Sequence, residues 1–79
     1  MVCPVILFYK YVPIVDPDAF AAAQRALCSD LGLKGRLLIA TEGINGTLVG
    51  EEAQINRYVA DLRADSRFAD IEMKVSAGG

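Results

Sequence analysis

Residues 35–50 read Gly-Arg-Leu-Leu-Ile-Ala-Thr-Glu-Gly-Ile-Asn-Gly-Thr-Leu-Val-Gly, two apolar runs on either side of a polar segment punctuated by glycine. Residues 36–41 are dominated by Leu, Ile and Ala, and residues 47–49 form a second short run that favours β-structure. Asn-Gly is the dipeptide that most readily forms a two-residue hairpin turn, because both residues tolerate positive φ. We therefore predict a β-hairpin whose turn lies at Asn45-Gly46.

The residues before the hairpin predict a strand and then a helix. Residues 5–12 are rich in β-branched and aromatic side chains and are apolar on both alternating faces apart from Lys10, a pattern typical of a central strand. Asp16 followed by Pro is a typical helix start, so we expect a helix over residues 17–31, ended by Gly32 in the left-handed conformation. The expected buried stripe of this helix is Phe20, Ala23, Leu27 and Leu31, with Gln24 and Cys28 on its flank.

The residues after the hairpin predict a second helix and a last strand. The acidic pair Glu51-Glu52 suits the electropositive start of a helix, which we expect to end near Ala64. After a turn, Phe68 is expected to fold back onto the core. Residues 71–75 alternate between apolar and charged side chains, which predicts a strand with one face on the core and one on water. The expected buried stripe of the second helix is Ile55, Tyr58, Val59 and Leu62.

The order strand, helix, strand, strand, helix, strand predicts an α+β fold of the ferredoxin-like βαββαβ type. This fold is a four-stranded antiparallel sheet with two helices on one face, and its first and third strands lie at the centre. The other face of the sheet is open, and we expect Lys10, Glu72 and Lys74 to contribute to it. Residues 1–76 are expected to form this domain, and residues 77–79 a linker stub.

Composition limits the chemistry that this chain can perform. It has 79 residues, a net charge of −2 and a sequence pI of about 4.9, so its whole surface cannot be the positive footprint of a nucleic-acid binder, although a local basic patch is compatible. It has no His, and Cys3 and Cys28 are too few and too far apart for a zinc site. Free thiols are favoured over a single Cys3–Cys28 bridge, and a thiol without a neighbouring base is not activated. We expect no catalytic residue, no metal and no cofactor.

The first residues do not form a targeting or membrane segment. No basic region precedes the apolar run, and no stretch of about 18 apolar residues is present. We therefore expect a cytoplasmic domain that is monomeric and makes no membrane contact.

The polar segment of the predicted hairpin is the first candidate contact site. It consists of Glu42, Gly43, Ile44, Asn45 and Gly46. Its two glycines would let the backbone approach a partner, while a carboxylate, an amide and an exposed Ile would lie at a loop tip. The alternative is a hairpin turn with no further role, because turn geometry alone explains Asn-Gly.

A second candidate site is a basic patch on the sheet. Lys10, Arg36 and Lys74 could form it, and the alternative is that these charges are scattered and only solvated. Tyr9 and Tyr11 are expected to pack within the domain and not to serve as base-stacking platforms.

Separated motifs in this chain resemble one known family. They are Phe-Tyr-Lys-Tyr-Val-Pro-Ile at 8–14, Gly-Arg-Leu-Leu-Ile-Ala at 35–40, Glu-Gly-Ile-Asn-Gly-Thr-Leu at 42–48 and Ala-Asp-Ser-Arg-Phe at 64–68. In this order and spacing they resemble the N-terminal domain of the rhodanese-related tRNA uridine hydroxylase family.

The resemblance implies an acylphosphatase-like ferredoxin fold ahead of a rhodanese-type domain that carries the active-site cysteine. It also implies that the full enzyme hydroxylates the wobble uridine of certain tRNAs. The implied partners are the downstream rhodanese domain of the same polypeptide and tRNA. Neither Cys3 nor Cys28 lies in a glycine-bounded basic loop, so the catalytic cysteine of the family is not carried onto this chain.

Two function classes follow from the sequence. One is a non-catalytic domain that helps to position tRNA or the catalytic domain of the parent enzyme. The other is a stand-alone phosphatase of the acylphosphatase type, which needs a phosphate-cradling loop with an Arg directly after the first strand. Residues 12–18 read Val-Pro-Ile-Val-Asp-Pro-Asp, with two prolines that lack N–H donors and two acids that repel phosphate, which disfavours this alternative.

Overall fold

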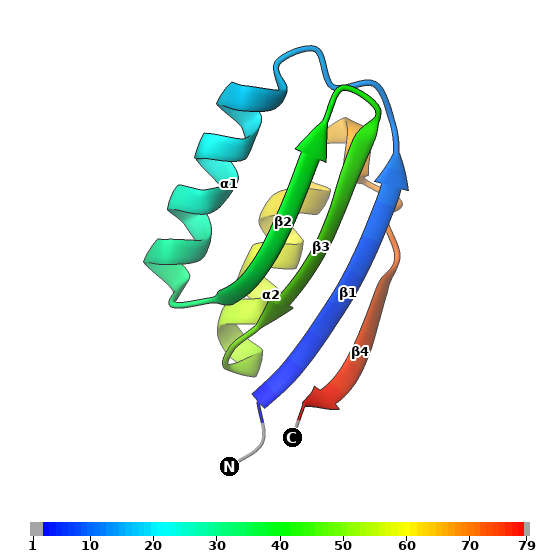
Figure 1. The fold of residues 1–79 in the computed structure, drawn as a ribbon. Coiled ribbons are helices and arrows are strands. Elements are labelled where there is room, and N and C mark those ends of the chain that lie inside the picture. Colours follow the sequence, from blue (N-terminus) through cyan, green and yellow to red (C-terminus); the bar gives the residue numbers. More distant parts are fainter. Residues whose placement is uncertain (1–2, 79) are drawn as a thin grey trace.

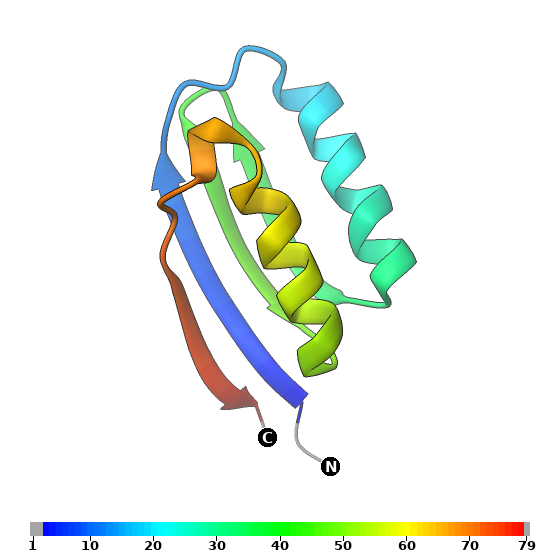
Figure 2. The ribbon, with the colours of Figure 1, turned by 180° about the vertical axis from the view of Figure 1, so that it is seen from behind.

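The computed structural model describes residues 3–78, which form a sheet layer and a helix layer (Figure 1). The elements are β1 (Cys3–Tyr11), α1 (Pro17–Leu31), β2 (Lys34–Ala40), β3 (Gly43–Val49), α2 (Glu52–Arg63), the 3₁₀-helix η1 (Ser66–Phe68) and β4 (Met73–Gly78). The strands are antiparallel in the order β2-β3-β1-β4, which confirms the predicted ferredoxin-like βαββαβ fold with the first and third strands at the centre. Both helices lie against the same face of the sheet (Figure 2).

Side-chain alternation along β1 separates the two faces of the sheet. Ile6 and Phe8 are buried beneath the helices, whereas Leu7, Tyr9 and Tyr11 have the opposite parity and are 43%, 66% and 82% exposed. The prediction of a central strand is confirmed, and its second apolar face lies on the side of the sheet that the helices leave open. The rest of the core comes from the helices, the hairpin and the loops: Ile14, Cys28, Leu33, Ile44, Leu48, Ile55, Tyr58, Leu62, Phe68 and Ile71.

Helix α1 has the predicted bounds and ends at Gly32, which has a φ of 70°. Its fully buried residues are Ala21, Gln24 and Cys28, while Ala23 is exposed. Phe20, Leu27 and Leu31 pack against the core as expected, so the prediction was wrong only for Ala23, and the buried stripe is shifted toward Gln24 and Cys28. The physical reason is that α1 packs against α2 as well as β2, and small or hydrogen-bonded side chains suit this contact between helices.

A buried hydrogen bond joins the two helices. The hydroxyl of Tyr58 donates to Oε1 of Gln24 over 2.7 Å, and both side chains are buried. Burial raises the pKa of Tyr58, and repulsion by the Asp61 carboxylate, and by Cys28 once it ionises, raises it further, so the hydroxyl remains protonated and acts as the donor. Gln24, which the sequence placed on the flank of α1, is thus a core residue with a partner.

The chain after α2 fixes the start of β4. Phe68 is fully buried, as predicted, and Arg63 Nη2 donates to the carbonyl of Ile71 over 2.8 Å. Val75 was expected to face the core but is 70% exposed, because β4 is an edge strand. Residues 77 and 78, expected as linker, extend β4 along β1, and Gly79 lies outside the described residues.

Arg67 connects η1 to the start of α1. Its guanidinium carbon lies 4.9 Å from the ring centroid of Phe20 and 5.4 Å from that of Phe68, and the two rings are stacked. Its Nη2 donates to Asp65 Oδ2 over 2.7 Å, and its Nε and backbone N–H donate to Asp65 Oδ1. These three hydrogen bonds lower the pKa of Asp65. Asp16 holds the predicted N-cap position, but its side chain caps no helix N–H and lies 3.9 Å from Arg67 Nη1.

The bond between the helices predicts non-additive mutations. Tyr58→Phe leaves Gln24 Oε1 buried without a donor and should lower the free energy of unfolding by about 1–3 kcal/mol. Tyr58→Phe combined with Gln24→Leu removes both partners and should cost less than the sum of the two single changes. Urea titration of the wild type, the two single variants Tyr58→Phe and Gln24→Leu, and the double variant measures this coupling. Strictly additive losses would contradict a direct bond.

The lowered pKa of Asp65 predicts a loss of stability in acid. A carboxyl whose folded pKa lies below its unfolded value, about 4, contributes stability that is complete above the unfolded pKa and is lost as pH falls through the folded pKa. Asp65→Asn keeps an acceptor for the η1 cap but removes the charge. This substitution should lower the free energy of unfolding by about 0.5 kcal/mol at neutral pH. It should also make the free energy of unfolding fall less steeply as the pH is lowered.

Urea titrations at neutral and acidic pH measure both effects. Asp30→Asn, at an exposed position of α1, is the control and should keep the wild-type decline. If Asp65→Asn declines as steeply as wild type, the Asp65–Arg67 pair is not a source of the acid sensitivity.

Candidate nucleic-acid interface

The β2–β3 hairpin turns at Thr41-Glu42, so the prediction of a turn at Asn45-Gly46 was wrong. Ala40 pairs with Gly43, and Leu38 pairs with Asn45, which places Asn45-Gly46 inside β3. Tertiary packing therefore overrides the strong local preference of Asn-Gly for a turn.

Backbone hydrogen bonds hold this turn against the loop that follows β1. The N–H of Val12 donates to the carbonyl of Glu42, and the N–H of Ile14 donates to the carbonyl of Thr41, each over 3.0 Å. The turn is thus part of the packed end of the domain, and its position is set by contacts outside the hairpin.

Two glycines let β3 lie close to its neighbours. A Cβ at Gly43, which has a φ of 156°, would lie 2.1 Å from the carbonyl oxygen of Lys10. A Cβ at Gly46 would lie 2.4 Å from Phe8 Cζ and 2.9 Å from Leu37 Cδ2. Gly46 therefore provides space for the Phe8 ring and is needed for packing.

The predicted contact tip is divided between the two faces of the sheet. Ile44 is 3% exposed and belongs to the core, so the expectation of an exposed Ile at a loop tip was wrong. Glu42 is exposed in the turn, and Asn45 is exposed on the face opposite Ile44. Of the expected tip, only Glu42 and Asn45 present exposed side chains to a partner.

The strand register assembles the exposed face. Leu38, Asn45 and Tyr9 form one row across β2, β3 and β1, and the next row runs from Arg36 through Thr47 and Leu7 to Lys74. This surface, here named the open face, faces the viewer in Figure 1. The side chains that define it are Leu7, Tyr9, Tyr11, Lys34, Arg36, Leu38, Asn45, Thr47 and Lys74. Glu72 lies beside Lys74 at the edge of this face, as expected.

Large apolar side chains are concentrated on the open face. Among the described residues, six large hydrophobic side chains are exposed, and four of them lie here: Leu7, Tyr9, Tyr11 and Leu38. Isolated exposed hydrophobics need no explanation, but a contiguous group marks an interaction surface. The two tyrosines were expected to pack, yet their parity relative to buried Ile6 and Phe8 already indicated this outward orientation.

The open face also carries positive charge. Lys34, Arg36 and Lys74 lie on it, and none of the ion pairs within residues 3–78 involves them. Lys10 does not belong to this group, because it has the parity of Phe8 and pairs with Asp70. The predicted patch of Lys10, Arg36 and Lys74 is therefore corrected: the register replaces Lys10 with Lys34.

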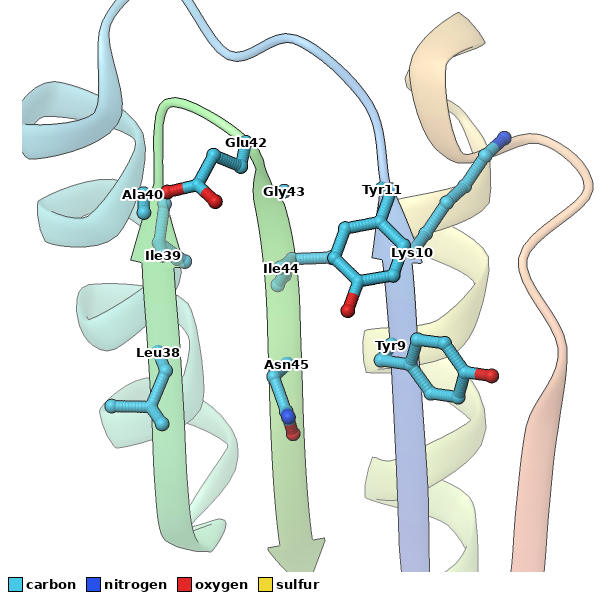
Figure 3. A pocket seen from close by; sticks show the side chains of 10 residues that line it. All are labelled: Tyr9, Lys10, Tyr11, Leu38, Ile39, Ala40, Glu42, Gly43, Ile44 and Asn45. Atoms are coloured by element: carbon cyan, nitrogen blue, oxygen red, sulfur yellow. The ribbon is translucent and has the colours of Figure 1, made fainter.

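A hollow of about 360 Å³ lies at the hairpin end of the open face (Figure 3). The ring of Tyr11 leans from β1 toward β3, and the ring of Tyr9 leans toward β4. The two centroids are 6.1 Å apart with the planes at 71°. Leu38, Asn45 and Glu42 complete the hollow, while Lys10 extends away from it toward the segment before β4.

Both cysteines are free, Cys3 exposed and Cys28 buried, and burial raises the pKa of the Cys28 thiol, which opposes thiolate formation. Within residues 3–78, no group of His, Cys, Asp and Glu is arranged to hold a metal ion. No helix in this range has the length and apolar character needed to cross a membrane.

Comparisons with known proteins place the chain among domains of the same kind. The sequence profile described as "UPF0176 acylphosphatase like domain" matches residues 3–78. A protein of Staphylococcus carnosus named tRNA uridine(34) hydroxylase is 52% identical over 71 residues, and proteins of the same name from Bacillus pumilus and Listeria monocytogenes are 49% and 48% identical. These matches cover 90–92% of this chain but only 22–23% of each relative, so the chain spans less than a quarter of their length.

The different environments of two neighbouring residues predict unequal mutational effects. Gly46→Ala drives a methyl group into the Phe8 ring and should lower the free energy of unfolding by about 1–3 kcal/mol. Asn45→Ala removes an exposed side chain from the other face of the same strand and should change it by less than about 0.5 kcal/mol. Thermal and urea unfolding measure both. Equal effects would contradict the observed register of β3.

Proposed function

This chain belongs to the UPF0176 acylphosphatase-like domain family, and we propose that it is the non-catalytic accessory domain of a tRNA uridine(34) hydroxylase, where it helps to position tRNA. The observation that carries the proposal is the open face, which combines Lys34, Arg36 and Lys74 with exposed apolar side chains. Cations on one face of a domain contact phosphates without reading sequence, as a positioning surface must.

The spacing of the cations fits a nucleic-acid backbone. Arg36 and Lys74 lie in the same row on the two edge strands, and neighbouring strands are about 4.8 Å apart, which separates their Cα atoms by about 14 Å. Lys34 lies one row further along β2. An RNA strand that crosses the sheet obliquely can contact all three side chains.

We propose that the chemistry of hydroxylation belongs to a downstream rhodanese-type domain of the same polypeptide, as the resemblance implies. Two features of this chain support that division. It has no His, and its buried cysteine has a raised pKa and lacks an activating base. Action on tRNA also supports a cytoplasmic location for the parent enzyme.

The acylphosphatase alternative is disfavoured by the loop after β1. The N–H groups of Val12 and Ile14 are already donated to the carbonyls of the β2–β3 turn, and Pro13 has no N–H. A phosphate cradle needs several free N–H groups that converge on one point, with a cation nearby. The shared fold is therefore no argument for phosphatase activity in this chain.

Docking on the catalytic domain is the second candidate role. Leu7 and Leu38 are exposed on the open face, and Glu42 is exposed in the turn, so these residues could contact another domain. Ile44 is excluded from such a contact because it is buried. The basic residues favour tRNA over this alternative, since protein interfaces need no such group of unpaired cations.

The positioning role predicts a selective defect in the full-length enzyme. Arg36→Gln with Lys74→Gln should raise KM for tRNA several-fold, leave kcat within about twofold and reduce the salt dependence of tRNA binding. The matched control is Arg25→Gln with Arg57→Gln, which removes the same charge from exposed positions of α1 and α2. Quantifying the modified uridine at varied tRNA concentrations measures KM and kcat. Equal KM for both double variants would contradict tRNA positioning by the open face.

A further inference from the structure

We propose that the hollow at the hairpin end of the open face binds one unpaired nucleotide of RNA, with its base stacked on the Tyr11 ring and its edge facing the amide of Asn45. This inference deepens the proposed positioning role and rests on it. It adds a site for a base to a surface otherwise suited only to phosphates.

The tyrosine rings are the first observation. Tyr9 and Tyr11 are 66% and 82% exposed, so stacking faces are accessible, and the two rings meet edge-on. Because the planes differ by 71°, the two rings cannot support one continuous stack of bases. They offer two walls in different directions, which suits bases that are splayed apart in a single-stranded loop.

The floor of the hollow is the second observation. Asn45 is exposed on β3 between Leu38 and Tyr9, and its amide makes no side-chain hydrogen bond within residues 3–78. The Tyr11 ring leans toward β3 beside it (Figure 3). An amide presents both a donor and an acceptor, which is the pattern that base edges complement. Leu38 supplies an apolar wall opposite the rings (Figure 3).

The charge distribution selects RNA over a protein as the occupant. Arg36 lies one row from Leu38 along β2, at about 6.6 Å between Cα atoms, so a phosphate attached to the bound nucleotide falls within reach of its guanidinium. Lys74 and Lys34 continue this positive path away from the hollow. Glu42, at the rim, is an acceptor for the N–H groups of a base and keeps phosphates away from the hairpin end.

Fluorescence of the isolated 79-residue chain tests the stacking directly. The chain has no Trp and three Tyr, of which Tyr58 is buried, so a fall in tyrosine emission on binding reports stacking at Tyr9 and Tyr11. The probes are a stem-loop RNA with an unpaired loop and a blunt RNA duplex of equal length. We expect the stem-loop to quench the emission and to bind more tightly than the duplex.

Variants separate stacking from charge. Tyr9→Leu with Tyr11→Leu should weaken stem-loop binding about tenfold or more, leave duplex binding unchanged and preserve the melting temperature, because both side chains are exposed. Asn45→Ala should reduce the difference in affinity among single-stranded homopolymers of U, C and A. Val15→Ala is the control, since Val15 is 91% exposed but lies off the open face.

Three results would overturn the nucleotide site. If the tyrosine variant binds the stem-loop as wild type does, the open face contacts only the backbone, and the positioning role stands without the base site. If the chain binds no RNA but the tyrosine variant raises KM in the full-length enzyme, a protein domain covers the rings. If neither the tyrosine variant nor the Arg36→Gln, Lys74→Gln variant changes KM, the positioning role itself fails.

Discussion

The ring of Phe8 occupies the space that a side chain at Gly46 would fill, and the rest of the sheet depends on this fit. The observed pairing of β1 with β3 places Phe8 opposite Gly46 and requires glycine there, because the Cβ of any other residue would meet the ring at less than 3 Å. A slip of one residue in a strand exchanges its two faces, so the same contact decides which side chains enter the core. Ile6, Ile44 and Leu48 are inside as a result.

The same register produces the open face. Once Phe8 points toward the helices, Tyr9 and Tyr11 must point away from them, and Asn45 must follow because it pairs with Tyr9. The helices cover only one face of the sheet, so these side chains remain exposed in the described domain (Figure 2). The exposed aromatic and basic surface is therefore a direct consequence of core packing on the other side of the same strands.

The sequence predicted the elements well and the hairpin poorly. Helical period, the Asp-Pro start and Gly32 defined α1 because local interactions determine these features. The hairpin turn was misplaced, because Asn-Gly is a strong local turn signal and the reason that it lies in a strand is the ring of Phe8, far away in the chain. The misplaced turn also changed the predicted site, because it put Ile44 at an exposed tip. It also prevented the prediction that Asn45, Arg36 and the two tyrosines lie on the same face of the sheet.

An acidic domain can still offer a positive surface to RNA, because its charges are partly segregated, with Glu42 and Glu72 the acids beside the open face. Lys10, Arg63 and Arg67 are engaged in bonds that hold the loops around η1, whereas Lys34, Arg36 and Lys74 are not. Many of the acids lie on the helix layer, about 10 Å from the sheet, and the Debye length at physiological salt is of the same size. Screening therefore removes most of their repulsion at the open face, while contacts between its cations and phosphates act at short range. Net charge is thus a weak guide to what one face of a two-layer domain can bind.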